Sequence, residues 1–165
     1  MNQKVRVLIA VGIIVLLIGA VIGIETLRGK RIAEQIDASL EPGDIPVYWN
    51  GDLRAAFSPI DIENLPQASF VDAEEGKTQE GWLLKDVLLV SFKENQFDDD
   101  THITVSSSSR EKSVELTWEE VANVDNMVLF DLSGRGTLKL VSLLEGFDVR
   151  DEWVQDVDRI EIETQ

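Results

Sequence analysis

An unbroken apolar run of 18 residues, 7–24, most constrains what this chain can fold into. Its sequence is VLIAVGIIVLLIGAVIGI, with no charge, no proline and no amide side chain. As an α-helix rising about 1.5 Å per residue it would be roughly 27 Å long, close to the hydrocarbon thickness of a bilayer. A bilayer offers no water to the backbone, so a single spanning segment has to be helical. The sequence therefore predicts a transmembrane helix at 7–24, preceded by a short tail at 1–6.

The run is predicted to be retained as an anchor rather than cleaved as a signal peptide. It is longer than the apolar core of about 7–15 residues in a signal peptide, and no small-x-small cleavage site follows promptly. Basic residues stand on both sides of it: Lys4 and Arg6 before, and Arg28, Lys30 and Arg31 after. The positive-inside count is therefore close to a tie and does not decide the orientation.

Three glycines, Gly12, Gly19 and Gly23, lie on roughly one face of this predicted helix. Gly19 and Gly23 form a small-xxx-small pair, which lets two helix backbones approach closely. Glycine is also simply common in membrane helices. A homodimer or a partner helix packed on this face is one hypothesis, and glycines without a packing role are the alternative.

The charge of the chain is strongly negative and unevenly placed. Of 31 acidic and 15 basic residues, Glu25 and five of the bases precede residue 32, which leaves 30 acids and 10 bases, a net charge of −20. Such a charge repels phosphate backbones, so nucleic acid is not an expected partner. It would attract cationic proteins or divalent cations, or it provides solubility. The chain contains no cysteine, which excludes disulfides, thiolate catalysis and cysteine-held metals.

Residues 25–43 are predicted to form a helical stalk or linker, which ends where Pro42 and Gly43 stop the helical spacing. One domain follows at 44–165, where short strands and helices of one or two turns alternate. Asn50-Gly51 predicts a hairpin, Ser58 a helix N-cap, and Thr117 with Glu120 a capping box. A loop is expected at 74–81 and a short helix at 82–90. The predicted fold class is α+β with a mixed or antiparallel sheet.

No set of residues in the sequence predicts a reaction. His102 is the single histidine, and no G-x-S-x-G motif accompanies it. Oxygen ligands of the kind that hard cations prefer gather in one loop. They are Asn95, Asp98, Asp99 and Asp100. The EF-hand pattern is absent, so the loop is either a weak Ca²⁺ site or a solvated acidic loop. No cofactor is expected.

Three segments together resemble the oxidoreductase molybdopterin-binding domain, the sulfite-oxidase-like fold. GWLLKDVLL at 81–89 is similar to its G-x-x-L-x-x-L-L helix, and residues 101–121 to the strand, turn, strand and capped helix that follow. Residues 136–163 resemble its closing segment, G-x-P-x-R-L-x-x-P with a later W-x-x-x-I-x-x. The order and spacing agree from about residue 45 to the end. The resemblance implies that fold, and it implies a domain outside the cytoplasmic membrane with a cytoplasmic N-terminus.

The departures from the family pattern argue against its activity. The family holds molybdenum with a cysteine thiolate, which this chain lacks; its closing Arg is Lys139 here, and its Pro is Thr137. With 30 acids after residue 31, this chain would receive an anionic cofactor poorly.

We therefore expect a single-pass protein of the cell membrane whose non-catalytic domain is a binding or accessory subunit for a protein partner. One alternative is a pterin- or small-ligand-binding protein, or an oxidoreductase component, that retains the inherited cleft. Another is an assembly subunit that acts through its transmembrane helix.

Overall fold

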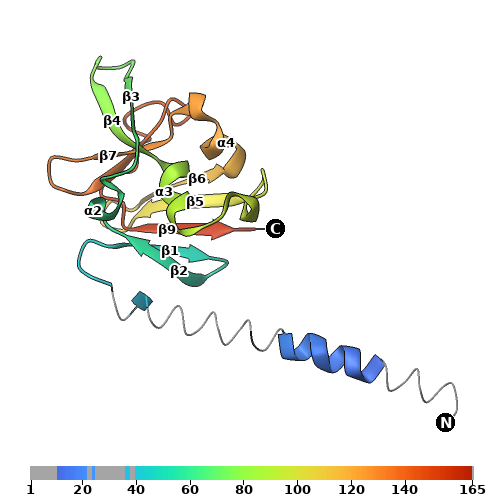
Figure 1. The fold of residues 1–165 in the computed structure, drawn as a ribbon. Helices are drawn as coiled ribbons and strands as arrows, with labels where there is room; N and C mark the ends of the chain where they lie inside the picture. Colours follow the sequence, from blue (N-terminus) through green and yellow to red (C-terminus); the bar gives the residue numbers. More distant parts are fainter. Residues whose placement is uncertain (1–10, 22–23, 25–35, 38–39, 165) are drawn as a thin grey trace, which may run out of the picture.

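The computed structural model describes residues 11–21, 24, 36–37 and 40–164 of the chain (Figure 1). Nearly all of the predicted domain at 44–165 is therefore described. Within these residues the fold is α+β, with one five-stranded sheet, one four-stranded sheet and short helices.

The prediction of a transmembrane helix at 7–24 is wrong. Residues 11–21 and residue 24 are helical. Residues 7–10 and 22–23 lie outside the described residues. In the described part of the chain, no helix has both the length and the apolar character needed to cross a membrane. The predicted single-pass cell-membrane location, with a cytoplasmic N-terminus, is contradicted by the same finding.

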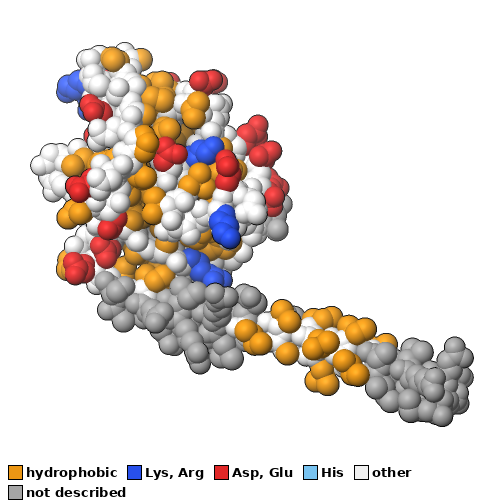
Figure 2. All heavy atoms as spheres, viewed as in Figure 1, with side chains coloured by type: hydrophobic (Ala, Val, Ile, Leu, Met, Phe, Trp, Pro, Cys, Tyr) orange, Lys and Arg blue, Asp and Glu red, His pale blue; other side chains and the backbone are white. Residues whose placement is uncertain are grey.

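The side chains along residues 11–21 are exposed and mostly hydrophobic (Figure 2). No atom lies within 4 Å of a Cβ placed on Gly12 or on Gly19. Gly23, and residues 25–35 and 38–39 of the predicted stalk, lie outside the described residues. The packing hypothesis for the three glycines therefore stays a prediction.

The five-stranded sheet joins the two ends of the domain. Its strands are β1 Ile45–Trp49, β2 Asp52–Phe57, β5 His102–Ser107, β6 Lys112–Thr117 and β9 Arg159–Glu163, in the order β2-β1-β9-β5-β6. The β1–β9 pair is parallel and the other pairs are antiparallel. Asn50 and Gly51 both have positive φ, 49° and 81°, as a two-residue hairpin turn requires, so the predicted hairpin is confirmed. In β9 the alternating Ile160 and Ile162 are fully buried.

The four-stranded sheet is antiparallel throughout. Its strands are β3 Gln67–Val71, β4 Thr78–Leu83, β7 Leu129–Leu132 and β8 Leu138–Val141, in the order β3-β4-β7-β8. Residues 78–81, expected in a loop, are instead the start of β4. Gln79 is buried there because its amide donates to Asp72 at 3.1 Å and its carbonyl accepts from Lys139 at 2.8 Å. Because the inward-facing residue Gln79 is polar, residues 78–81 lack the alternation of hydrophobic and polar residues that would have predicted a strand.

The helices are short, and side chains cap the N-terminus of α4. They are α2 Pro59–Ile62, α3 Leu84–Ser91 and α4 Trp118–Ala122, with 3₁₀ turns η1 Glu94–Gln96 and η2 Val124–Asn126. The predicted capping box is confirmed: the Thr117 amide donates to the Glu120 carboxylate at 2.7 Å, and the Glu120 amide donates to the Thr117 hydroxyl at 3.3 Å. The helix expected from residue 82 begins at Leu84, because Trp82 and Leu83 pair with β7.

An aromatic cluster packs these helices against the five-stranded sheet. Phe97 stacks on Trp118 with ring centroids 4.0 Å apart, and Trp49 of β1 lies 5.1 Å from both Phe92 and Phe97. On the other side of the core, residues 142–158 return from β8 to β9 without regular secondary structure. This returning segment passes the turns of both sheets, and the candidate site lies along it.

Candidate functional site

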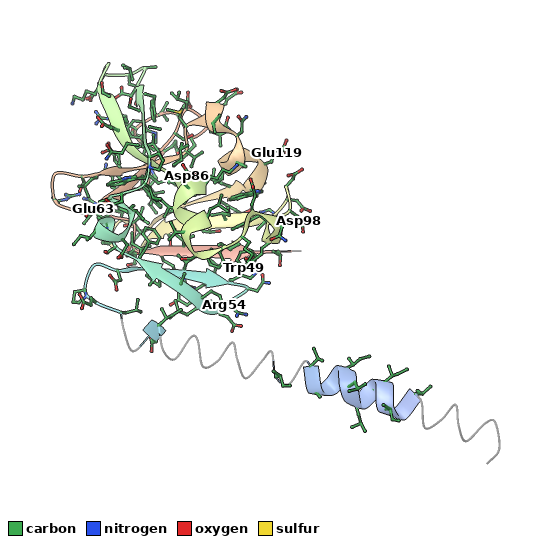
Figure 3. The ribbon with its side chains drawn as sticks, in the orientation of Figure 1. Trp49, Arg54, Glu63, Asp86, Asp98 and Glu119 are labelled. Atoms are coloured by element: carbon green, nitrogen blue, oxygen red, sulfur yellow. The ribbon has the colours of Figure 1, made fainter. Side chains whose placement is uncertain are left out.

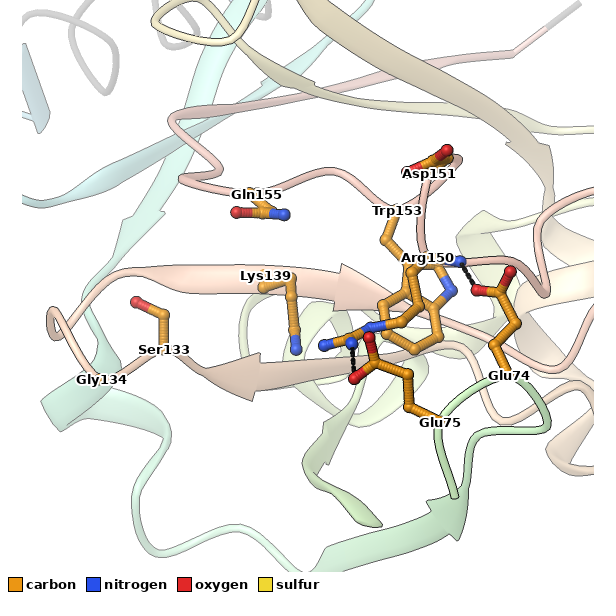
Figure 4. Close-up of a pocket in the computed structure, with 9 residues that line it drawn as sticks. All are labelled: Glu74, Glu75, Ser133, Gly134, Lys139, Arg150, Asp151, Trp153 and Gln155. Atoms are coloured by element: carbon orange, nitrogen blue, oxygen red, sulfur yellow. Dashed lines mark hydrogen bonds and ion pairs between the residues drawn. The ribbon is translucent and has the colours of Figure 1, made fainter. Parts of the chain in front are cut away.

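A cleft of about 560 Å³ opens where the β3–β4 turn, the β7–β8 turn and the returning segment meet (Figure 4). The β3–β4 turn contributes Glu74 and Glu75, and β8 contributes Lys139. The returning segment contributes four lining residues: Arg150, Asp151, Trp153 and Gln155. Ser133 and Gly134 of the β7–β8 turn complete the lining.

Asp72 shapes the turn that presents the two glutamates. Its buried carboxylate accepts the Glu75 amide at 2.6 Å, and its main chain bonds with Lys77 and Gly76 across the turn. The amide of Glu75 is the main reason that the pKa of Asp72 lies below its ordinary value. Gly76 has a φ of 65°, which a residue with a side chain rarely adopts.

Arg150 is held from two sides by these glutamates. Its amide donates to the Glu74 carboxylate at 2.8 Å, and its guanidinium forms an ion pair with Glu75 (Figure 4). Glu75 also pairs with Lys77 at 2.6 Å. Lys77 first, and Arg150 second, hold the pKa of Glu75 below its ordinary value, so this carboxylate is charged at neutral pH.

Trp153 lies beside two cations in the lining of the cleft. The Lys139 ammonium is 5.3 Å from the centre of its ring and the Arg150 guanidinium 5.7 Å, distances typical of cation–π contacts. Trp153 is 2% exposed, and its indole N–H has no hydrogen-bond acceptor among the described residues. A buried donor left unpaired costs about 1–3 kcal/mol, so this N–H is a group that a bound acceptor would satisfy.

Lys139 is anchored at the position where the closing motif of the resembled family has Arg. Its ammonium lies 3.0 Å from the Asp131 carboxylate and 2.8 Å from the Gln79 carbonyl oxygen. Its side chain is 16% exposed, so it contributes charge to the cleft from a nearly buried position.

A second hollow of about 220 Å³, which we call the side recess, continues from the cleft. The two share Arg150, Asp151, Trp153 and Gln155, and the side recess adds Arg110 from the β5–β6 turn and Lys112 from the start of β6. We call the cleft and the side recess together the groove. The groove is therefore built between the turns of both sheets and the returning segment.

Asp156 fixes the returning segment to both turns. Its carboxylate accepts from Arg110 at 2.7 Å, from Arg135 at 2.9 Å and from the Thr137 hydroxyl at 2.7 Å. The Thr137 hydroxyl first, and then the Arg110 and Arg135 guanidiniums, hold the pKa of Asp156 below its ordinary value. Its φ of 55° lies in the left-handed region, where aspartate is among the few tolerated residues.

Positive charge gathers in the groove against the charge of the domain. Arg110, Lys112, Lys139 and Arg150, four of the ten basic residues after residue 31, line it. The acids among the lining residues are Glu74, Glu75 and Asp151. The lining residues alone sum to about +1, and Asp131 and Asp156, which pair with Lys139 and Arg110, offset that excess. The groove is therefore close to neutral, whereas residues 32–165 carry a net charge of −20.

The acidic residues proposed for Ca²⁺ lie elsewhere. Asn95 is in η1, and Asp98, Asp99 and Asp100 are exposed ahead of β5, with Asp98 on the same side of the domain as Glu119 (Figure 3). Main-chain carbonyls of this loop accept the amides of Thr101, at 2.9 Å, and of Glu119, at 3.0 Å. Among the described residues, no group of three or more acidic or histidine side chains is placed to hold a metal ion.

His102 lies away from the groove, at the start of β5. Its Nδ1 is 2.9 Å from the Glu115 carboxylate of β6, and its side chain is 37% exposed. The residues that line the groove include no histidine. A molybdenum centre of the resembled family does not fit here either, because the groove offers amines, guanidiniums, carboxylates and an indole but no thiolate.

Sequence reasoning found one groove residue and missed the others. Lys139 stands out in the sequence because it replaces the Arg of the closing motif that the chain resembles. Arg150 and Trp153 stand in a segment without periodicity, and Arg110 and Lys112 belong to an ordinary hairpin, Arg110 in its turn and Lys112 at the start of β6. The one available signal was the spacing of basic residues in a chain this acidic.

A scan of models of known protein families finds no match to this chain, and a search of curated proteins also finds none.

Proposed function

We propose that residues 44–165 form a ligand-binding domain rather than an enzyme, and that the ligand is a small molecule with an anionic group held in the cleft. The observation that carries this proposal is the clustering of four cationic side chains along one groove of a domain that has 27 acids and 10 bases, a net charge of −17.

The geometry of the cleft supports an anionic ligand. Lys139 and Arg150 lie within cation–π distance of the ring of Trp153, and the indole N–H of Trp153 has no partner among the described residues. Ammonium, guanidinium and indole groups are all donors, and hydrogen bonds from charged donors to an oxyanion are about twice as strong as neutral ones. A volume of about 560 Å³ is within the range of small-molecule sites.

The negative charge of the rest of the domain does not prevent such binding. The Debye length is about 8 Å at physiological ionic strength, so exposed acids beyond that distance are largely screened. The two cleft glutamates are engaged, Glu75 by Lys77 and Arg150, and Glu74 by the Arg150 amide. Overall charge is therefore a poor guide to the ligand of this site.

The sulfite-oxidase-like resemblance is retained here as a proposal about ancestry. It is supported by the position of Lys139, which keeps a positive charge where the closing motif has Arg, in the wall of the cleft. The absence of cysteine supports binding without the molybdenum chemistry of that family. The role as accessory subunit of a protein partner stays a prediction that no observation tests.

Titration calorimetry of the full-length chain with orthophosphate at low salt tests the proposal. We expect binding that weakens about tenfold in Lys139→Gln, because a charge-assisted hydrogen bond is lost. Glu75→Gln should bind phosphate more tightly, because it removes a carboxylate that competes for Arg150.

The matched control is Lys85→Gln. Lys85 is also partly buried and paired with an acid, Glu94 at 3.1 Å, but lies on α3 away from the groove. An equal loss of phosphate affinity in Lys85→Gln and Lys139→Gln, or no binding by the parent protein, would contradict the proposal.

A further inference from the structure

The side recess adds a second cationic position to the groove. The cleft has Lys139 on its wall and the side recess has Lys112, and Arg150 and Trp153 line both. A single molecule placed across Arg150 would therefore meet separate cations in the two hollows.

Lys112 differs from the other cations of the groove because its charge is not balanced. Arg110 pairs with Asp156, Lys139 with Asp131, and Arg150 with Glu75. Lys112 is partly buried and donates to the main-chain carbonyl of Asp151, and it forms no ion pair within the described part of the chain. A carbonyl oxygen accepts a hydrogen bond from an ammonium but does not neutralise it.

The unpaired indole N–H of Trp153 is a second, independent observation at the same place. It belongs to a side chain that is 2% exposed and that lines both hollows. An uncompensated ammonium and an unsatisfied donor on one groove are groups that a bound anion would satisfy together.

We propose that the ligand carries two anionic groups, one bound in the cleft beside Lys139 and Arg150 and the other in the side recess beside Lys112. This inference rests on the proposed function and specifies its ligand as a small bis-anion, such as a diphosphate or a dicarboxylate. Lys112 is then the residue that distinguishes a bis-anion from a mono-anion of the same chemistry.

The test compares two bis-anions with their mono-anionic counterparts on the full-length chain by titration calorimetry. The probes are pyrophosphate against orthophosphate, and glutarate against butyrate. The two bis-anions differ in the distance between their charged groups and in whether those groups are phosphates or carboxylates. We expect at least one bis-anion to bind tenfold or more tightly than its counterpart. That preference should fall to about threefold or less in Lys112→Gln and persist in Lys112→Arg, which keeps the charge.

The control is Lys93→Gln, since Lys93 is exposed on η1's N-terminal side and, like Lys112, forms no ion pair among the described residues. A thermal unfolding curve of each variant shows that it is folded. Equal affinity for bis- and mono-anions, or a preference that Lys112→Gln leaves intact, overturns the inference while the proposed function stands. Failure of all four probes to bind the parent protein overturns the proposed function itself.

Discussion

Gly81 of β4 lies so close to Phe130 of β7 that a Cβ placed on Gly81 would be 1.7 Å from the Phe130 carbonyl oxygen. The same Cβ would be 2.7 Å from the Phe130 carbonyl carbon. Both are backbone atoms of a fully buried strand residue, so they cannot turn aside as a flexible side chain would. Gly81 is thus required by the approach of two strands, at the start of the motif that leads into α3.

Gly81→Ala should lower the free energy of unfolding by about 3 kcal/mol, because the β4 and β7 backbones have to separate. Urea unfolding followed by circular dichroism measures the loss. The control is Gly134→Ala in the β7–β8 turn, where an added Cβ meets no atom within 4 Å and φ is not positive. A Gly81→Ala protein as stable as Gly134→Ala would contradict the strand contact.

Asp156→Asn should destabilise the domain by about 2 kcal/mol, since Arg110 and Arg135 both lose their charged acceptor. Asparagine tolerates the left-handed backbone at this position, so the change reports on charge rather than on strain. Asp52→Asn is the control, because its pair with Arg54 at 3.5 Å is exposed and such pairs contribute about 0–1 kcal/mol. Equal effects of the two substitutions on urea unfolding would argue against a structural role for Asp156.

The pH dependence of stability should also report on the bonds of the Asp156 carboxylate with Thr137, Arg110 and Arg135. The pKa of Asp156 in the folded protein is below its ordinary value of 3.8, chiefly because the Thr137 hydroxyl and then Arg110 bond to the charged form. Its contribution is therefore fully present above about pH 4 and is lost as the pH falls through the lowered folded value. The pKa values of Asp61, Asp72 and Glu75 are lowered as well, so the parent protein should lose stability steeply below about pH 4.

The comparison between parent and Asp156→Asn isolates one of these groups. The difference in their free energies of unfolding should be constant from pH 7 to about pH 5 and shrink below about pH 4, where Asp156 in the parent becomes protonated. Unfolding in urea at a series of pH values measures this difference. A gap that stays constant down to pH 2 would show that the Asp156 carboxylate is not held charged by its neighbours.

Local signals predicted much of the secondary structure but not how it is assembled. Asn50-Gly51 and the Thr117 capping box depend on contacts between near neighbours in sequence, which composition and spacing reveal. The parallel pairing of Val47 with Ile160 depends on contacts across the whole domain. Alternation shows which strand residues face inward, but it does not show which strand lies beside which. The prediction for the N-terminal run rested on hydropathy alone, and no helix in the described part of the chain has the length and apolar character needed to cross a membrane.

The site was harder to predict than the fold because it belongs to no single segment. Overall charge argued against an anionic ligand, yet the fold brings Arg110, Lys112, Lys139 and Arg150 together from the β5–β6 turn, β8 and the returning segment. No local sequence motif distinguishes any of these four basic residues from other basic residues of the chain. Sequence spacing draws attention to clusters within one loop, such as Asn95–Asp100, whose side chains are not placed to hold a metal ion among the described residues. It misses a groove that three distant segments form.

Trp153→Phe should weaken binding of orthophosphate about tenfold, because it removes the one indole donor that lies at the cleft. The chain offers a close control in Trp82→Phe. Trp82 is also buried, at 4% exposure, and its indole N–H also lacks an acceptor among the described residues, but it does not line the groove. Both substitutions lose similar packing and both relieve an unpaired donor, so their costs in the free energy of unfolding should agree within about 1 kcal/mol. Calorimetric titration of the two variants then shows whether the Trp153 N–H donates to the ligand. If it does, Trp153→Phe binds phosphate more weakly than Trp82→Phe; if it is only an unpaired buried group, the two variants bind phosphate equally.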